Sequence, residues 1–305
     1  MLRRLILWLS RSGLAERAAS GLPGVRSFSH RFVAGQTQAD ALDAVAQLNA
    51  GGFEATVSYL GEAVESEERA REAAGELASL VREARARGLR TGVSVKLTQL
   101  GLAFDRALAE ELLGRVIDAA REAGSFVRID MEDSRYTQPT LEVFERVRQA
   151  HPRVGVVIQA YLRRSRADID ALAASDASLR LVKGAYREPA SVALQTKAEV
   201  DAAYVDLVEA YFDRASSARL AIATQDVRIV RAALASTRRR RLVRERFEFQ
   251  MLYGIRTGLQ RTLRDRGYIV RVYVPYGTHW YPYLMRRLAE RPANLWFFLS
   301  NAVRR

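Results

Sequence analysis

Short runs of β-branched and other apolar residues recur along the whole chain. The run from Val154 to Ile158 is the clearest, because it contains only valine, isoleucine and one glycine. Apolar runs of this kind indicate strands that are buried on both faces, as in a parallel sheet. The pattern predicts eight strands, at residues 53–57, 92–97, 126–130, 154–159, 179–183, 220–224, 247–250 and 269–274.

Amphipathic segments lie between these runs. Alanine and leucine recur at helical spacing among charged residues, most clearly in the segment 65–87. The predicted helices cover residues 39–48, 65–87, 106–123, 141–149, 167–174, 192–214, 227–235 and 258–266. Strands and helices that alternate eight times favour a (β/α)₈ barrel over a doubly wound sheet.

Polar side chains gather where the predicted strands end. In a barrel of this kind the chemistry takes place at the carboxyl ends of the strands. Capping or turn formation would explain any one of these side chains alone, but together they predict an active site at this end. They are Lys96, Asp130 with Met131 and Glu132, Gln159 with Tyr161, residues 183–186, Thr224 with Gln225, Gln250 with Tyr253, and Tyr273.

The last predicted strand leads through a turn into a helix that begins near residue 281. Arg286 and Arg287 are adjacent on one face of this helix. Two neighbouring guanidinium groups suit a carboxylate or a phosphate, although an ordinary solvated helix face is the alternative. The aromatic residues of the same stretch favour a binding site. They are Tyr273, Tyr276, Tyr281 and Tyr283.

Composition narrows the chemistry. The 305 residues are 49% hydrophobic, which is enough for one large domain. The net charge of +13 favours anionic partners without choosing among nucleic acid, acidic lipid and small acids. The absence of cysteine excludes disulfides and thiolate catalysis, and three scattered histidines predict no metal site. No glycine-rich dinucleotide motif or Walker loop follows a predicted strand.

Two basic regions lie outside the predicted site. Residues 1–35 are expected to form a helical arm, and residues 36–305 the barrel domain. The apolar run near the N-terminus is too short for a signal peptide or a bilayer span of roughly 20 residues, so we expect a cytoplasmic protein.

The block 238–246 is expected to be a solvated face, with contact to an anionic membrane as the alternative. Nucleic acid is not expected, because no aromatic residues are interleaved with this block.

Several stretches together resemble the flavin-dependent proline dehydrogenases of the monofunctional bacterial type. The resemblance covers the chain from about residue 32 to the C-terminus. It implies a distorted (β/α)₈ barrel with an extra C-terminal helix over the active site and FAD held without a covalent bond. It also implies oxidation of L-proline to 1-pyrroline-5-carboxylate by hydride transfer to flavin N5, with electrons passed to a membrane quinone. The matching stretches are residues 93–101, 127–133, 180–189, 223–226, 247–254 and 271–290.

The resemblance also implies roles for individual residues. Arg286 and Arg287 resemble the clamp on the proline carboxylate, with Lys96 nearby and Glu290 orienting the clamp. Tyr273 and Tyr283 resemble the walls of the proline pocket. Asp130, Tyr186 and Arg180 resemble the catalytic polar groups, with Arg180 near flavin N5. The residues that resemble flavin contacts are Met131, Gln159, Arg180, Lys183, Gly184, Ala185, Thr224 and Gln225.

Two positions depart from the pattern of the family. Gln225 stands where relatives commonly have histidine, so an uncharged amide must serve the cofactor there. Ser58 stands where relatives often have an acid. Glu62 is retained, and we expect it to pair with Arg286 and close the site over substrate.

Three other functions remain open at this point. A Schiff-base lyase is possible because Lys96 and Lys183 both lie near predicted strand ends. A hydroxyproline-type dehydrogenase is the second, although Tyr273 stands where a small residue would leave room and is expected to crowd out a hydroxylated ring. A basic module that binds nucleic acid without catalysis is the third alternative. The resemblance also suggests peripheral contact with the inner face of an anionic membrane and coupling to a pyrroline-5-carboxylate dehydrogenase.

Overall fold

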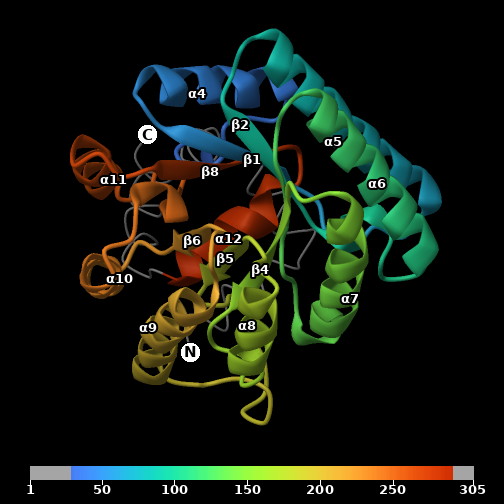
Figure 1. The fold of residues 1–305 in the computed structure, drawn as a ribbon. Coiled ribbons are helices and arrows are strands. Elements are labelled where there is room, and N and C mark those ends of the chain that lie inside the picture. Colours follow the sequence, from blue (N-terminus) through green and yellow to red (C-terminus); the bar gives the residue numbers. More distant parts are fainter. Residues whose placement is uncertain (1–28, 291–305) are drawn as a thin grey trace, which may run out of the picture.

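The computed structural model describes residues 29–290 and shows eight parallel strands that close into a barrel in sequence order (Figure 1). β8 pairs with β1 to close it, with Tyr273 beside Thr56. The predicted barrel is therefore confirmed. The strands are β1 (Glu54–Tyr59), β2 (Thr91–Val95), β3 (Val127–Ile129), β4 (Val154–Gln159), β5 (Leu179–Val182), β6 (Leu220–Ala223), β7 (Phe247–Leu252) and β8 (Val270–Tyr276).

Helices surround this barrel (Figure 1). Side chains cap most of their first turns, and Thr37 and Thr196 each form a capping box. The helices are α4 (Gln38–Ala50), α5 (Glu67–Ala86), α6 (Arg106–Glu122), α7 (Ser134–Ala150), α8 (Ser165–Ala174), α9 (Lys197–Arg214), α10 (Val227–Arg239) and α11 (Thr257–Asp265).

Some boundaries differ from the prediction. α7 begins at Ser134 rather than at 141 and continues over Pro139, because Asp133 caps its first turn. α9 begins after its Thr196 cap rather than at 192. The pattern of apolar residues also gave no sign of two 3₁₀ turns, η1 (Leu97–Leu100) and η2 (Arg244–Arg246).

Alternate positions on the strands face opposite sides of the barrel wall. On β2, β3, β5, β7 and β8 the outward positions are apolar and buried in the main core beneath the helices, as Val93 and Ile129 are. The positions between them carry polar side chains that bond to one another inside the barrel, as Ser94 and Arg180 do. This period of two follows from strand geometry, and it lines the interior with polar groups rather than the usual branched aliphatic layers.

An ion pair between Glu248 and Arg271 lies near the amino end of this interior. The Glu248 side chain is only 3% exposed and accepts hydrogen bonds from Arg271 Nε and Nη2 at 2.8 and 3.1 Å. Burial alone would raise the pKa of the Glu248 carboxyl. The Arg271 guanidinium outweighs this effect and lowers the pKa to about 2. Gln250 Nε2 also donates to Glu248, which joins this pair to the middle of the barrel.

A last helix, α12 (Trp280–Glu290), crosses the barrel in Figure 1 instead of standing beside it. Its apolar residues form a second core with the segment before α4. That segment hydrogen-bonds to the end of β8, through Ala34 N to Pro275 O and Gly277 N to Gly35 O. Of the expected N-terminal arm only residues 29–35 are described, so the arm stays a prediction. The second core contains Phe32, Val33, Leu60, Trp280, Tyr281, Tyr283, Leu284, Met285 and Leu288.

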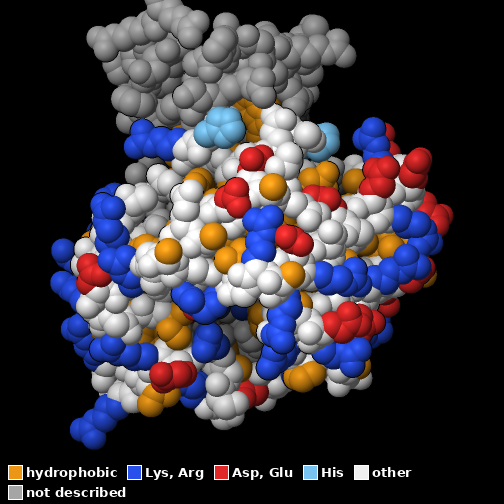
Figure 2. Space-filling view, turned by 90° about the horizontal axis from the view of Figure 1, so that it is seen from above, with side chains coloured by type: hydrophobic (Ala, Val, Ile, Leu, Met, Phe, Trp, Pro, Cys, Tyr) orange, Lys and Arg blue, Asp and Glu red, His pale blue; other side chains and the backbone are white. Residues whose placement is uncertain are grey.

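The face of the molecule in Figure 2 carries basic and acidic side chains interspersed. In the block 238–246, Arg239 and Arg240 pair with Glu209, and Arg246 donates to backbone carbonyls at 215 and 218. These arginines therefore have partners within the fold. The block directly precedes β7 and so lies at the amino end of the barrel. Within residues 29–290, no helix has the length and apolar character needed to cross a bilayer.

Replacing Glu248 by glutamine should leave the buried Arg271 charge with only the more distant carboxylate of Glu54, at 3.9 Å. We expect the free energy of unfolding at pH 7 to fall by about 3–5 kcal/mol, measured by chemical denaturation. The control is Glu83→Gln, which removes an exposed pair with Arg87 and should cost less than about 1 kcal/mol.

The difference between wild type and Glu248→Gln should also depend on pH. The pKa of Glu248 in the folded protein lies below the ordinary value of 4.5, so the stabilisation by its negative charge is fully present above pH 4.5. It should be lost progressively as the pH falls towards 2. A difference that stays constant across this window would contradict the assignment of the charge.

Candidate active site

Asp130 is the residue on which the site converges. It directly follows β3 and is 8% exposed. Asp130 Oδ1 accepts a hydrogen bond from Arg180 Nη1 at 2.7 Å, and Oδ2 accepts one from the Tyr273 hydroxyl at 3.0 Å. Lys96 Nζ lies 3.5 Å from Oδ2. Four strands thus bring these four predicted residues together at the carboxyl end of the barrel.

The Arg180 guanidinium is fixed on several sides. Nη1 also donates to Ser94 Oγ at 2.9 Å, and Nε donates to Gln250 Oε1 at 2.5 Å. Its Cζ lies 5.4 Å from the centre of the Tyr273 ring. A cation held this firmly needs no reorganisation when charge develops beside it. Ser94 was missed by sequence reasoning, although its spacing of two from Lys96 places both on the same side of the strand.

Protonation of the site follows from these contacts. Burial alone would lower the pKa of the Lys96 ammonium, but its interactions with Tyr273, Asp130 and Glu62 raise it well above its ordinary value. Burial, followed by the negative charge of Glu62, raises the pKa of the Tyr186 phenol in the same direction. At neutral pH, Lys96 is therefore a charged ammonium and Tyr186 a neutral phenol.

Glu62 and Arg286 join the loop after β1 to α12. Arg286 Nη2 lies 2.8 Å from Glu62 Oε1, and Nη1 lies 3.5 Å from Oε2. Both side chains are about one quarter exposed, at 25% and 26%. The ion pair expected from the sequence is present. The neighbouring Arg287 lies with its Cζ 5.3 Å from the centre of the Tyr283 ring. The side chain of Glu290 lies outside the described residues.

The ends of β4 and β5 provide a buried polar atom and a closely packed turn. Gln159 is 2% exposed, and its Oε1 has no hydrogen-bond partner in the described part of the chain. Gly184 has a φ of 110°, and a Cβ there would lie 2.1 Å from Tyr161 Cδ1. Only glycine combines this backbone conformation with so close an approach. Met131 and Thr224 are also buried at this end, and Ala185 is half-buried.

Lys183 has partners that the sequence did not indicate. Its Nζ lies 2.5 Å from Asp201 Oδ1 and 3.1 Å from Asp226 Oδ2. Asp226 N in turn donates to Thr224 Oγ1 at 3.1 Å. Gln225 Oε1 accepts a hydrogen bond from the backbone N–H of Leu252 at 3.3 Å, so its amide holds the end of β7.

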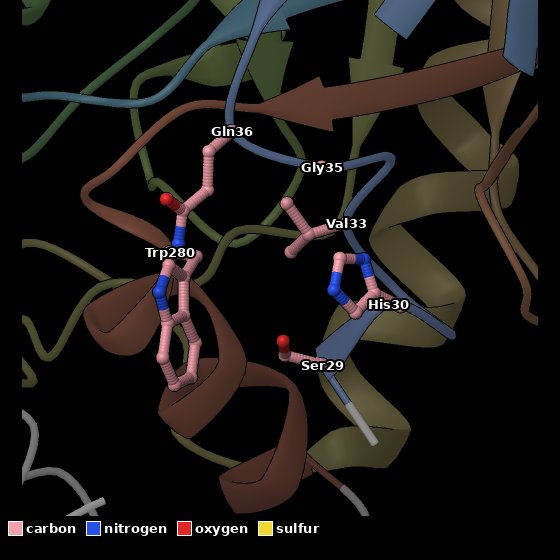
Figure 3. A pocket seen from close by; sticks show the side chains of 6 residues that line it. All are labelled: Ser29, His30, Val33, Gly35, Gln36 and Trp280. Carbon is pink, nitrogen blue, oxygen red and sulfur yellow. The ribbon is translucent and has the colours of Figure 1, made fainter. Parts of the chain in front are cut away.

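A separate small pocket lies where the segment before α4 meets α12 (Figure 3). Its volume of about 10 Å³ is close to that of one water molecule, which excludes it as a substrate site. It is lined by Ser29, His30, Val33, Gly35, Gln36 and Trp280.

Comparison with known proteins decides the family. The family model described as proline dehydrogenase matches residues 41–299. The chain belongs to the proline dehydrogenase family. It is 38% identical to proline dehydrogenase 1 of Bacillus subtilis, with all of both chains covered. It is also 38% identical to the proline dehydrogenase of Deinococcus radiodurans, with 91% of each covered. As a proline dehydrogenase it oxidises proline, the first step of proline catabolism.

Solved structures of longer proteins contain the same barrel. Proline utilization A from Bdellovibrio bacteriovorus, inactivated by N-propargylglycine, superposes with a TM-score of 0.81 at 29% identity. The match covers 87% of this proline dehydrogenase but only 32% of that chain. The bifunctional protein PutA of Escherichia coli is 27% identical over 90% of this chain and 24% of its own length.

Adding a methyl group at Gly184 should disturb this strand end. Gly184→Ala meets the Tyr161 ring and forces a side chain into a left-handed conformation. We expect the free energy of unfolding to fall by about 2 kcal/mol or more, as measured by denaturant titration. The control is Gly75→Ala on the exposed face of α5, where no atom lies within 4 Å of the new Cβ. It should stabilise by about 0.5–1 kcal/mol, and equal effects of the two would contradict the close approach.

Proposed function

We propose that this proline dehydrogenase uses non-covalently bound FAD to convert L-proline into 1-pyrroline-5-carboxylate, and that a membrane quinone takes the electrons. The observation that carries the proposal is the buried Arg180 cation at the carboxyl end of the barrel, fixed by Asp130 and Ser94 beneath a helix that presents two more arginines. A flavin accepts hydride, and a positioned cation stabilises the negative charge that the flavin gains.

The residues present fit a flavin. Gln159 offers a buried acceptor that nothing in the described chain occupies, and the N3–H group of a flavin ring is a suitable donor. The absent side chain at Gly184 lets the end of β5 pack directly against the Tyr161 ring, which fixes the shape of this strand end. Two carboxylates position the Lys183 ammonium, whose third N–H would donate to a pyrophosphate oxygen. The residues that would hold FAD are Met131, Gln159, Arg180, Lys183, Gly184, Ala185, Thr224 and Gln225.

The arginines of α12 would hold the substrate. Arg286 and Arg287 are proposed to clamp the proline carboxylate, and each charged hydrogen bond would contribute about 1.5–3 kcal/mol. Tyr273 and Tyr283 would form the pocket walls. We propose that Glu62, already paired with Arg286, closes the entrance, and that Glu290 orients the clamp.

Hydride can leave only from a neutral amine. If the proline amine behaves like a lysine with a pKa near 10.4, deprotonating it at pH 7 costs about 4–5 kcal/mol. The positive charges of Lys96 and Arg180 reduce that cost by disfavouring an ammonium beside them. Asp130 already accepts from Arg180 and Tyr273, and Tyr186 stays a neutral phenol, so we assign the proton to solvent. Asp130, Arg180 and Tyr186 are then the polar groups around the reacting atoms.

The alternatives receive less support. A Schiff-base lyase needs an uncharged amine, whereas Lys96 and Lys183 are both paired with carboxylates. A hydroxyproline-type dehydrogenase would have to accommodate an extra hydroxyl beside the Tyr273 ring, whose position is fixed by its hydrogen bond to Asp130.

Transfer to a quinone requires contact with the inner face of the membrane. The block 238–246 is a poor candidate for that contact, because it lies at the amino end of the barrel, away from the site. We propose instead that an anionic membrane meets the protein near α12. Functional coupling to a pyrroline-5-carboxylate dehydrogenase is proposed because relatives include a protein named bifunctional PutA.

The substitution Arg287→Met tests the clamp. It should remove about 3 kcal/mol of carboxylate binding, which raises the KM for L-proline roughly 100-fold. The FAD content, read from the absorbance spectrum, should not change. Arg115→Met is the control, because Arg115 is exposed on α6 and should alter neither quantity. An unchanged KM in Arg287→Met would remove the clamp from the proposal.

A further inference from the structure

The 3₁₀ turn η1 lies between β2 and α6 and depends on a buried acid from the loop after β3. Glu132 is 4% exposed, and both of its oxygens are bonded to Thr98. Oε1 accepts a hydrogen bond from Thr98 N at 3.0 Å, and Oε2 accepts one from Thr98 Oγ1 at 2.5 Å. Lys96, at the N-cap position of η1, provides no side-chain cap. Glu132 therefore satisfies the backbone N–H that a cap residue would normally bind.

Thr98 also hydrogen-bonds to the loop after β1, which carries Glu62. Because its only hydroxyl proton is donated to Glu132, Oγ1 is free to accept a hydrogen bond from Ala63 N, at 3.1 Å. The Thr98 carbonyl accepts another from Val64 N at 3.3 Å. Two consecutive residues of the loop are thus bonded to one residue of η1.

The loop needs such support. Ala63 has a φ of 50°, in the left-handed region that residues with a side chain rarely adopt. A residue held there persists only when its surroundings fix it. Gln99 of η1 adds a third contact, from its Nε2 to Tyr59 O at 3.2 Å. Glu62 stands in the chain between Tyr59 and Ala63, and its carboxylate pairs with Arg286 of α12.

We propose that Thr98 and Glu132 are positioning residues that hold the loop 60–64 in the conformation in which Glu62 meets Arg286. This inference rests on the proposed function, in which that ion pair closes over the substrate carboxylate. Thr98 and Glu132 act through Glu62.

The test measures how fast a ligand leaves the FAD-loaded protein. Cyclopentanecarboxylate keeps the ring and acid of proline but has no amine to oxidise, and its dissociation can be followed by stopped flow through the flavin spectrum. Thr98→Val keeps the shape of the side chain and removes the hydroxyl. It should raise the dissociation rate roughly tenfold, the effect of losing about one hydrogen bond. Thr98→Ser keeps the hydroxyl and should dissociate at nearly the wild-type rate.

A double-mutant cycle separates positioning from a general structural role. In a Glu62→Ala background, Thr98→Val should add nothing to the dissociation rate, because the two act through one contact. Glu132→Gln provides a second variant with the same expected dependence on Glu62 if Thr98→Val fails to fold. The thermal midpoint of each variant is recorded alongside.

The outcomes distinguish this inference from the proposed function. If Glu62→Ala accelerates dissociation while Thr98→Val and Glu132→Gln leave it unchanged, the inference is wrong and the gate stands. The inference is also overturned if Thr98→Val accelerates dissociation equally with and without Glu62. If Glu62→Ala itself dissociates at the wild-type rate, the gate of the proposed function fails, and the inference fails with it.

Discussion

The buried ion pair between Arg180 and Asp130 is the interaction on which the rest of the structure depends. Two charges removed from water are tolerated only when further hydrogen bonds satisfy them. Here Ser94 and Gln250 bind the guanidinium, and Tyr273 and Lys96 approach the carboxylate. These partners come from several strands, so the pair joins the inward-facing polar residues of those strands into one network.

The same network links the stability of the barrel to its site. Gln250 bonds to Arg180 on one side and to Glu248 on the other, and Glu248 in turn holds Arg271. A hydrogen-bonded chain therefore runs from the amino end of the interior to the carboxylate at the mouth. A network that is fully satisfied in this way is rigid, and a rigid cation is what a developing negative charge requires.

Much of this could be predicted from the sequence, and the physical reason is the period of the strands. Residues 154–159 were predicted with the boundaries that β4 has, because an apolar run of this kind has few alternatives. Polar strand ends such as Lys96 and Asp130 were found because barrel geometry brings them together. The Glu62–Arg286 pair spans 224 positions, and only resemblance to a family could anticipate it.

Other features had no local signal. The partners of Lys183 come from α9 and from the loop after β6, so nothing near residue 183 identifies them. Thr98 lies in a short 3₁₀ turn that shows no periodicity, and its bond to Glu132 depends on the register between β2 and β3. The early start of α7 was missed because helices seldom continue over a proline such as Pro139.

The central claim is that this polar interior positions a cation and a substrate clamp around a flavin that takes hydride from proline. The most direct measurement mixes FAD-loaded protein with L-proline in the absence of oxygen and quinone and follows the flavin absorbance. The account predicts that the yellow absorbance is lost, because electrons enter the flavin and have no acceptor to leave to. Folded protein with a full complement of FAD that keeps its oxidised spectrum under these conditions would contradict it.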